Sequence, residues 1–198
     1  MRIVIKVGTS TLAHETGKLN IKRTDKLCKV LSDLKNAGHE VILVSSGAIG
    51  MGVGKLGLSE KPKDIPGRQA AATVGQCELM FMYDKFFGEN GVKTGQLLIT
   101  KSDIESPDRK QNLENTFEKL FEYGAVPIIN ENGSVATEEI VIARFHGGHQ
   151  LIGDLLGLHG RSLLEGNHIG GDLLVDLQAF VNLAGTVAVP EIGDVTVL

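Results

Sequence analysis

Met1-Arg2-Ile3-Val4-Ile5-Lys6-Val7-Gly8-Thr9-Ser10 is the stretch that says most about this chain. Residues 3–7 are apolar except for Lys6, and Gly8 follows them directly. A strand that is apolar on both faces is typical of a parallel sheet covered by helices. Such sheets bind ligands beyond the carboxyl ends of their strands. A lysine there can contact phosphate oxygens, and a glycine lets backbone N–H groups approach an anion.

A second strand of this kind is predicted over residues 40–44, where aliphatic residues run into Ser45-Ser46-Gly47-Ala48. Between the two strands, residues 23–37 have apolar side chains at helical spacing, and Gly38 is a helix stop. A strand–helix–strand unit brings both glycine-bearing turns to one edge of a parallel sheet. Lys6 alone would be read as a lysine at an edge strand, but the second turn favours a phosphate or carboxylate site.

Strands and helices continue to alternate beyond this unit. The pattern predicts an Ala-rich helix over 68–87, a strand over 95–100, an amphipathic helix over 112–123 and a strand over 124–132. We therefore expect an α/β fold with a doubly wound, mainly parallel sheet sandwiched by helices in three layers. Gln69 and Gln76 share the small-residue side of the Ala-rich helix. They either line a site or, as is commoner for glutamine, face solvent.

Composition limits the classes of function. The chain has 198 residues and a net charge of −4, without a basic stripe, so a nucleic-acid partner is not predicted. No apolar run is long enough to cross a membrane and no signal peptide opens the chain, so we expect a cytoplasmic protein without a membrane partner. Cys28 and Cys77 lie in helical apolar patterns without metal-binding spacing, and both are predicted to be buried, reduced thiols.

Four blocks of sequence carry a resemblance to a known family. They are Lys6-Val7-Gly8-Thr9-Ser10, Val44-Ser45-Ser46-Gly47-Ala48-Ile49, Gly95-Gln96-Leu97-Leu98-Ile99-Thr100 and Pro127-Ile128-Ile129-Asn130-Glu131-Asn132, joined by the helical segment 69–76. Over residues 1–140 the chain resembles the amino acid kinase family, and within it the enzymes that phosphorylate L-glutamate. The resemblance implies transfer of the γ-phosphoryl group of ATP to the side-chain carboxylate. The product would be L-glutamyl 5-phosphate, in the first step of proline biosynthesis.

The resemblance also implies roles for single residues. Lys6 would be catalytic, contacting the phosphates and stabilising charge in the transition state. The other nucleotide contacts would be Gly8, Thr9 and Asp176, and the L-glutamate contacts would be Ser46, Gly47, Ala48 and Asn130. No protein ligand for a metal is implied, because Mg²⁺ would be held chiefly by the phosphates of ATP. Feedback inhibition by proline and assembly into a homo-oligomer, a dimer or tetramer, are further expectations.

The chain departs from the family pattern after Asn132. Gly133 stands where the family has an aspartate that engages the substrate, and Phe145-His146-Gly147-Gly148-His149-Gln150 replaces an acidic segment. His146 and His149 are compatible with a metal site, but a surface loop is the simpler explanation because no third ligand is evident. We expect a substrate-binding lobe over residues 1–142 and a divergent, incomplete nucleotide-binding lobe over 143–198.

Two alternatives to an active kinase therefore stay open. One is a catalytically impaired relative that binds glutamate or proline as a sensor or assembly partner. The other is a normal kinase whose last fifty-odd residues are damaged or artificially altered, which would leave this polypeptide inactive.

Overall fold

The computed structural model describes residues 2–14, 18–136 and 195–197. Its elements are β1 (Arg2–Val7), α1 (Thr9–Leu12), α2 (Ile21–Asn36), β2 (Glu40–Val44), α3 (Ala48–Leu56), α4 (Ile65–Gly88), β3 (Lys93–Ile99), α5 (Lys101–Glu105), α6 (Pro107–Glu122), β4 (Ala125–Glu131) and β5 (Val195–Val197). Each strand and helix predicted from the sequence is present. The helix predicted from residue 68 begins at Ile65, and the one predicted from residue 112 begins at Pro107.

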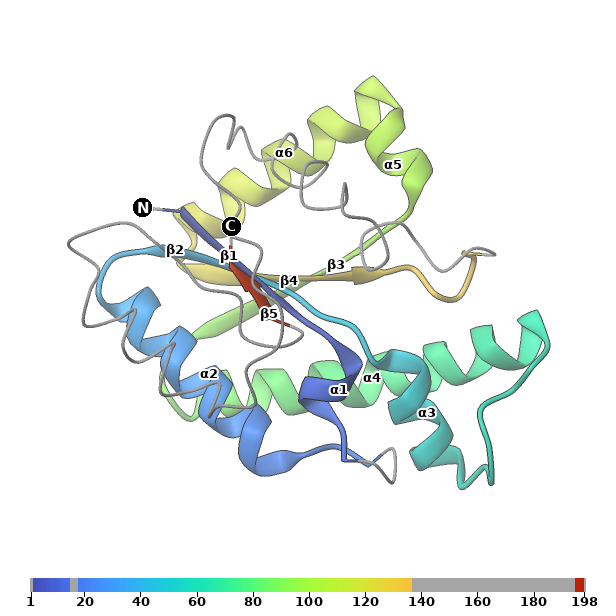
Figure 1. Cartoon of the computed structure of the whole chain (residues 1–198). Helices are drawn as coiled ribbons and strands as arrows, with labels where there is room; N and C mark the ends of the chain where they lie inside the picture. Colours follow the sequence, from blue (N-terminus) through green and yellow to red (C-terminus); the bar gives the residue numbers. More distant parts are fainter. Residues whose placement is uncertain (1, 15–17, 137–194, 198) are drawn as a thin grey trace.

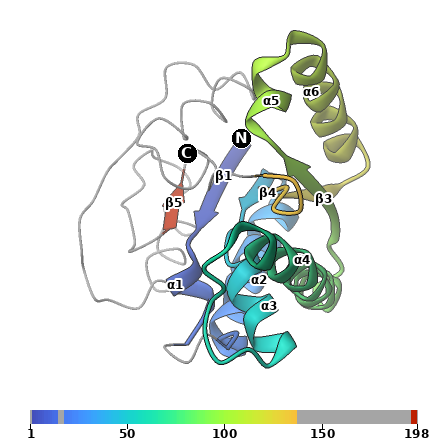
Figure 2. The ribbon, with the colours of Figure 1, turned by 90° about the vertical axis from the view of Figure 1, so that its right-hand side faces the viewer.

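The strands form one sheet in the order β3-β4-β2-β1-β5. The first four strands run parallel, and β5 pairs with β1 in the antiparallel direction. Figure 2 shows β5 at one edge of the sheet and β3 at the other. Helices α2 and α4 cover one face, and α5 and α6 cover the other (Figure 1). The structure thus confirms the predicted three-layer α/β fold with a doubly wound, mainly parallel sheet.

Side chains that alternate along the strands build a core on each face of the sheet. Ile5 of β1 packs with residues of α2 and α4, among them the fully buried Tyr83 and Phe87. Its neighbour Val4 packs on the opposite face with Phe117 of α6. Because both faces are covered, the middle residues of the central strands are apolar, which explains why the sequence pattern predicts these strands.

The two cysteines have different environments. Cys28 of α2 is buried in the core, and this burial raises the pKa of its thiol. The prediction that Cys77 is buried is wrong, because Cys77 lies on an exposed side of α4. Small and apolar residues occur all around α4, so the helical pattern does not tell which side faces the core.

Helices α3 and α4 touch through glycine. A Cβ atom placed on Gly75 would lie 1.8 Å from the carbonyl oxygen of Ala48, and one on Gly52 would lie 1.8 Å from that of Ala71. The two helices therefore approach until their backbones are in contact, which any side chain at either glycine would prevent. This contact fixes the position of the first turn of α3 at the edge of the sheet.

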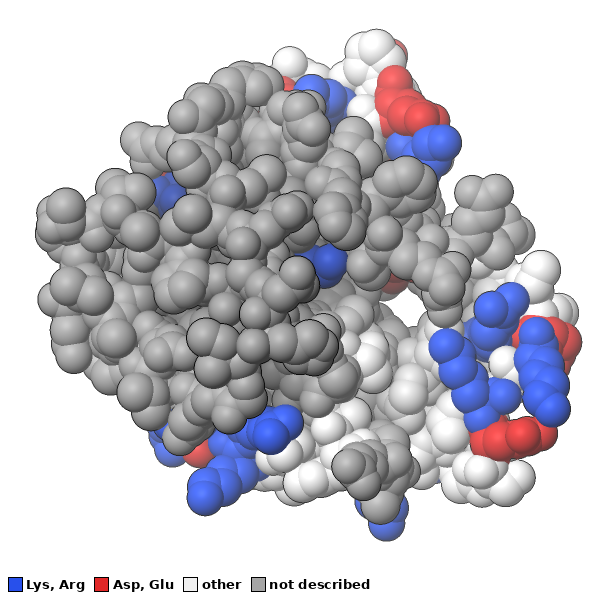
Figure 3. Space-filling view, viewed as in Figure 1, with Lys and Arg blue, Asp and Glu red and all other residues white. Residues whose placement is uncertain are grey.

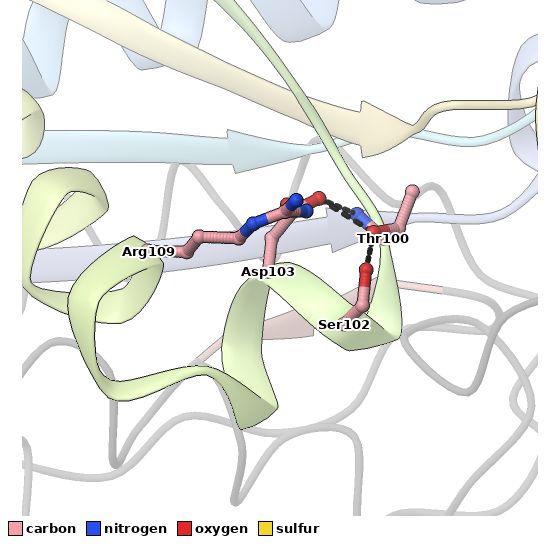
Figure 4. A network of polar contacts seen from close by, with 4 residues as sticks. All are labelled: Thr100, Ser102, Asp103 and Arg109. Atoms are coloured by element: carbon pink, nitrogen blue, oxygen red, sulfur yellow. Dashed lines mark hydrogen bonds and ion pairs between the residues drawn. The ribbon is translucent and has the colours of Figure 1, made fainter.

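Thr100 and Asp103 connect β3 to α5 through a capping box, shown in Figure 4. The Asp103 carboxylate accepts hydrogen bonds from the backbone N–H of Thr100 at 2.7 Å and from its hydroxyl at 2.6 Å. Arg109 of α6 donates to the same carboxylate at 2.8 Å. Partial burial opposes ionisation of Asp103, but these hydrogen bonds and the charge of Arg109 outweigh it and lower the pKa.

Asp103→Asn should therefore destabilise the chain by about 1 kcal/mol near neutral pH, the usual value of a lost helix cap. A carboxyl whose pKa is lowered by folding stabilises the protein above its ordinary pKa of 3.8 and loses that contribution below it. The difference in free energy of unfolding between native chain and variant should shrink from about pH 7 to about pH 3. Urea titrations at the two pH values measure it, and a constant difference would contradict the assignment.

Charged side chains of both signs lie side by side where the loop 57–64 leads into α4, at the right of Figure 3. Lys63 and Glu60, for example, approach within 3.7 Å while both remain exposed. Such mixed charge is typical of a solvated surface. Within the described ranges, no helix combines the length and the apolar character needed to cross a membrane.

Candidate functional site

The turns that follow β1 and β2 lie against each other at the carboxyl ends of these strands. The hydroxyl of Ser46 donates to the carbonyl oxygen of Val7 at 3.0 Å. It also lies 3.4 Å from the hydroxyl of Thr9, the first residue of α1. The strand–helix–strand unit predicted this meeting, and the structure brings Gly8 and Thr9 together with Ser46 and Gly47.

Gly47, the residue before α3, has a conformation that other residues rarely adopt. Its φ is +96°, in the left-handed region, where L side chains are strained. A Cβ atom there would lie 3.6 Å from the methyl carbon of Thr9, an ordinary contact. Glycine is therefore required by the positive φ of this position and not by a lack of room for a side chain. The turn leads directly into Ala48, whose N–H belongs to the first turn of α3 and needs a partner from outside the helix.

Lys6 lies near the end of β1, in register with Val44 of β2 and with Thr196 of β5. Residues alternate along a strand, so Lys6 is on the sheet face of Val4, opposite the face of Ile5 and Val7. Its side chain is half-buried. Lys6 thus stands at the edge of the sheet where the two turns emerge.

Asn130, the fourth predicted substrate contact, is buried near the end of β4. Its amide nitrogen donates to Gln76 of α4 at 2.7 Å, and its amide oxygen accepts from the N–H of Glu131 at 2.8 Å. The N–H of Ser45 donates to the carbonyl of Ile129 at 2.8 Å, so β4 ends beside the turn of β2. Gln76 is consequently not a solvent-facing glutamine.

The segment after β4 is held along α4. Gln69 donates through its amide to the carbonyl oxygen of Ala136 at 3.1 Å. Gly133 lies between the end of β4 and Ala136. A Cβ atom on Gly133 would lie 2.8 Å from the Cβ of Ala72, so close that one of the two residues would have to move. An aspartate at position 133 would therefore require this segment to move away from α4.

Tyr83 supports the turn after β2 from inside the core, and the sequence did not indicate this role. Its fully buried hydroxyl lies 2.8 Å from the hydroxyl of Ser45, and Ser45 in turn donates to the carbonyl of Ser46 at 3.3 Å. Burial raises the pKa of Tyr83, so the group acts as a neutral hydroxyl. Nothing local marks a tyrosine in an apolar helix as the partner of a serine so far along the chain.

Tyr83→Phe should reduce the free energy of unfolding by about 1 kcal/mol, the typical value of one neutral hydrogen bond. The aromatic ring and its packing are retained, so little else changes. Equilibrium unfolding in urea measures the loss. Tyr123→Phe is the matched control because Tyr123 is 70% exposed, and it should leave stability unchanged. Equal stability of the two variants would mean that the Ser45–Tyr83 contact contributes nothing.

A shallow recess adjoins the two turns. It is lined by Thr9, Leu12, Ala13, Ser46, Gly47, Gly50, Met51 and Leu79. Within the described part of the chain, no three His, Cys, Asp or Glu residues come close enough together to hold a metal ion. Asp176, the histidines at 146 and 149 and the rest of segment 145–150 lie outside the described residues.

These features define a class of protein. Its members have a three-layer α/β/α fold with two glycine-bearing turns at the ends of adjacent parallel strands. Residues 1–151 match the amino acid kinase family, and the chain belongs to this family.

Similar curated proteins fit this assignment. Glutamate 5-kinase of Caldanaerobacter subterraneus subsp. tengcongensis is 54% identical over 142 residues, 72% of this chain and 38% of that protein. Glutamate 5-kinase of Clostridium perfringens is 53% identical over 139 residues, 70% of this chain and 52% of that protein. Glutamate 5-kinase of Listeria innocua is 52% identical over 151 residues, 76% of this chain and 55% of that protein. The chain thus spans between 38% and 55% of the length of these relatives.

Proposed function

We propose that this chain catalyses the ATP-dependent phosphorylation of the side-chain carboxylate of L-glutamate, giving L-glutamyl 5-phosphate for proline biosynthesis. The observation that carries the proposal is the contact between the Thr9 and Ser46 turns at the carboxyl ends of β1 and β2. The relatives named glutamate 5-kinase, at 52–54% identity, support the choice of substrate. A cytoplasmic location accords with this role.

The proposed mechanism follows from the charges of the reactants. Both ATP and glutamate are anionic, so the site must offset their repulsion and align the acceptor oxygen with the transferred group. Lys6, with Gly8 and Thr9, would face the phosphates, while Ser46, Gly47, Ala48 and Asn130 would hold glutamate. No general base is needed, because a carboxylate is already deprotonated at neutral pH.

Magnesium is the metal that such a reaction implies. The described residues offer no group of carboxylates that fits a protein-held Mg²⁺, so we assign no step to the ion. It would arrive bound to the phosphates of ATP, whose negative charge it neutralises. Asp176 remains a proposed nucleotide contact, outside the described residues.

Three further expectations belong to the proposal. Residues 1–142 would form the substrate-binding lobe and residues 143–198 the divergent nucleotide-binding lobe. Of the second range, the described strand β5 pairs with β1 in the same sheet. Proline would act as a feedback inhibitor, and the chain would assemble as a homo-oligomer.

Formation of glutamyl hydroxamate from L-glutamate, ATP and hydroxylamine tests the activity directly. It should be combined with separate calorimetric titrations of L-glutamate and ATP. Turnover supports the kinase. Glutamate binding without turnover supports the impaired relative that acts as a sensor or assembly partner. A folded chain that neither binds glutamate nor turns over would overturn the proposal.

A further inference from the structure

Gln76 carries a buried hydrogen-bond donor that the described residues leave unused. The residue is only 8% exposed, and its Nε2 has no hydrogen-bond partner in the described part of the chain. Its Oε1, in contrast, accepts from Asn130 at 2.7 Å. Buried amide donors are nearly always paired, because leaving one unpaired costs stability. An unpaired one beside a binding site therefore suggests a partner that arrives with a ligand.

The position of Gln76 connects the two groups of proposed substrate contacts. It follows Gly75, whose Cα touches the carbonyl of Ala48 in the first turn of α3. On its other side it holds Asn130 at the end of β4. Gln76 thus lies between the turn after β2 and the end of β4. Ligands of this fold bind at the same edge of the sheet, beyond the carboxyl ends of the strands.

The chemistry of the pair selects the kind of group it can bind. The Asn130 Nδ2 has two hydrogens and gives one of them to Gln76, so one N–H is left. Gln76 Nε2 has both of its hydrogens left. Two neighbouring amides that offer only donors match a carboxylate, which accepts through two oxygens.

We propose that Gln76 is a substrate-binding residue whose Nε2 donates to a carboxylate oxygen of the bound amino acid, while its Oε1 orients Asn130 for the same group. The inference rests on the proposed function, since it takes L-glutamate as the ligand. Gln76 would then favour a ligand with a carboxylate at this position over an uncharged isostere, because an isostere without these acceptor oxygens leaves the donors unpaired.

Two substitutions at this position separate the donor from the rest of the side chain. Gln76→Met keeps the approximate volume and removes both polar atoms. Gln76→Glu keeps an oxygen that can accept from Asn130 but places a negative charge where the donor was. Gln69→Met is the matched control, because Gln69 belongs to the same helix and loses one hydrogen bond to a backbone carbonyl, that of Ala136.

Calorimetric titration of L-glutamate and of ATP into the 198-residue chain gives the result. Gln76→Met should weaken glutamate binding about tenfold, Gln76→Glu more than that, and both should bind ATP within about twofold of the native chain. Gln69→Met should bind both ligands normally. Thermal unfolding without ligand verifies that each variant is folded. If Gln76→Glu does not fold, Gln76→Met alone still decides.

Native glutamate affinity in Gln76→Met would overturn the inference and leave the proposed function intact, with a water molecule as the simplest partner of Nε2. Equal weakening of glutamate binding and ATP binding would also overturn the inference, because such a result indicates a structural effect. A native chain that binds no glutamate removes the proposed function, and this inference with it.

Discussion

Lys6→Ala should abolish phosphoryl transfer while the chain keeps its fold. The residue stands half-buried at the edge where the turns of β1 and β2 emerge, and it is the proposed cation for the transferred group. Removing such a charge should lower the rate by about 10³-fold, because the transition state of phosphoryl transfer spreads negative charge over several oxygens. The hydrophobic core around Ile5 and Val7 lies on the other sheet face and should be unaffected.

Hydroxamate formation measures the rate, and thermal unfolding verifies the fold. Lys6→Met separates charge from packing, since it keeps an unbranched stem of similar length and should be as inactive as Lys6→Ala. Lys29→Ala is the control, because Lys29 is an exposed lysine of α2 paired with Asp25 at 2.7 Å and should retain the native rate. A Lys6→Met chain with near-native turnover would remove Lys6 from the mechanism.

The fold was predictable from the sequence because the information is local. The central strands are covered on both faces, so β1, β2 and β4 are apolar along their middle residues, and their bounds were predicted within a few residues. Helix α2 has an apolar stripe and ends at Asn36, shortly before Gly38, whose φ of +90° suits glycine. Helix α5 was missed, although the spacing of Thr100 and Asp103 is that of a capping box and would have indicated its start.

The candidate site was only partly predictable. The meeting of Thr9 with Ser46 follows from topology, because parallel strands joined by one helix end at the same edge. The pairs Gln76–Asn130 and Ser45–Tyr83 join residues 54 and 38 positions apart, and no local pattern relates their members. The sequence left Gln76 undecided between a site and solvent, since an Ala-rich helix has no distinct apolar face. Tertiary packing determines whether Gln76 faces the site or solvent.

Gly52→Ala should be the most damaging small substitution in α3. A methyl group there would lie 1.8 Å from the carbonyl oxygen of Ala71 and 2.6 Å from its carbonyl carbon. Both atoms belong to the backbone of α4, so no side chain can turn away, and the two helices must separate. We expect a loss of about 3 kcal/mol in the free energy of unfolding, at the upper end of the usual cost of overpacking. Equilibrium unfolding in urea measures it.

Gly54→Ala is the control for this prediction because it differs only in its surroundings. Gly54 is two residues further along the same helix, has no positive φ, and a Cβ atom there would meet nothing within 4 Å. Alanine should therefore stabilise the chain by roughly 0.5–1 kcal/mol through its higher helix propensity. Because Gly47 caps α3 and Ala48 begins it, Gly52→Ala should also weaken glutamate binding, whereas Gly54→Ala should not. If both variants were equally stable, the contact between α3 and α4 would be looser than the structure has it, and the first turn of α3 would need another support.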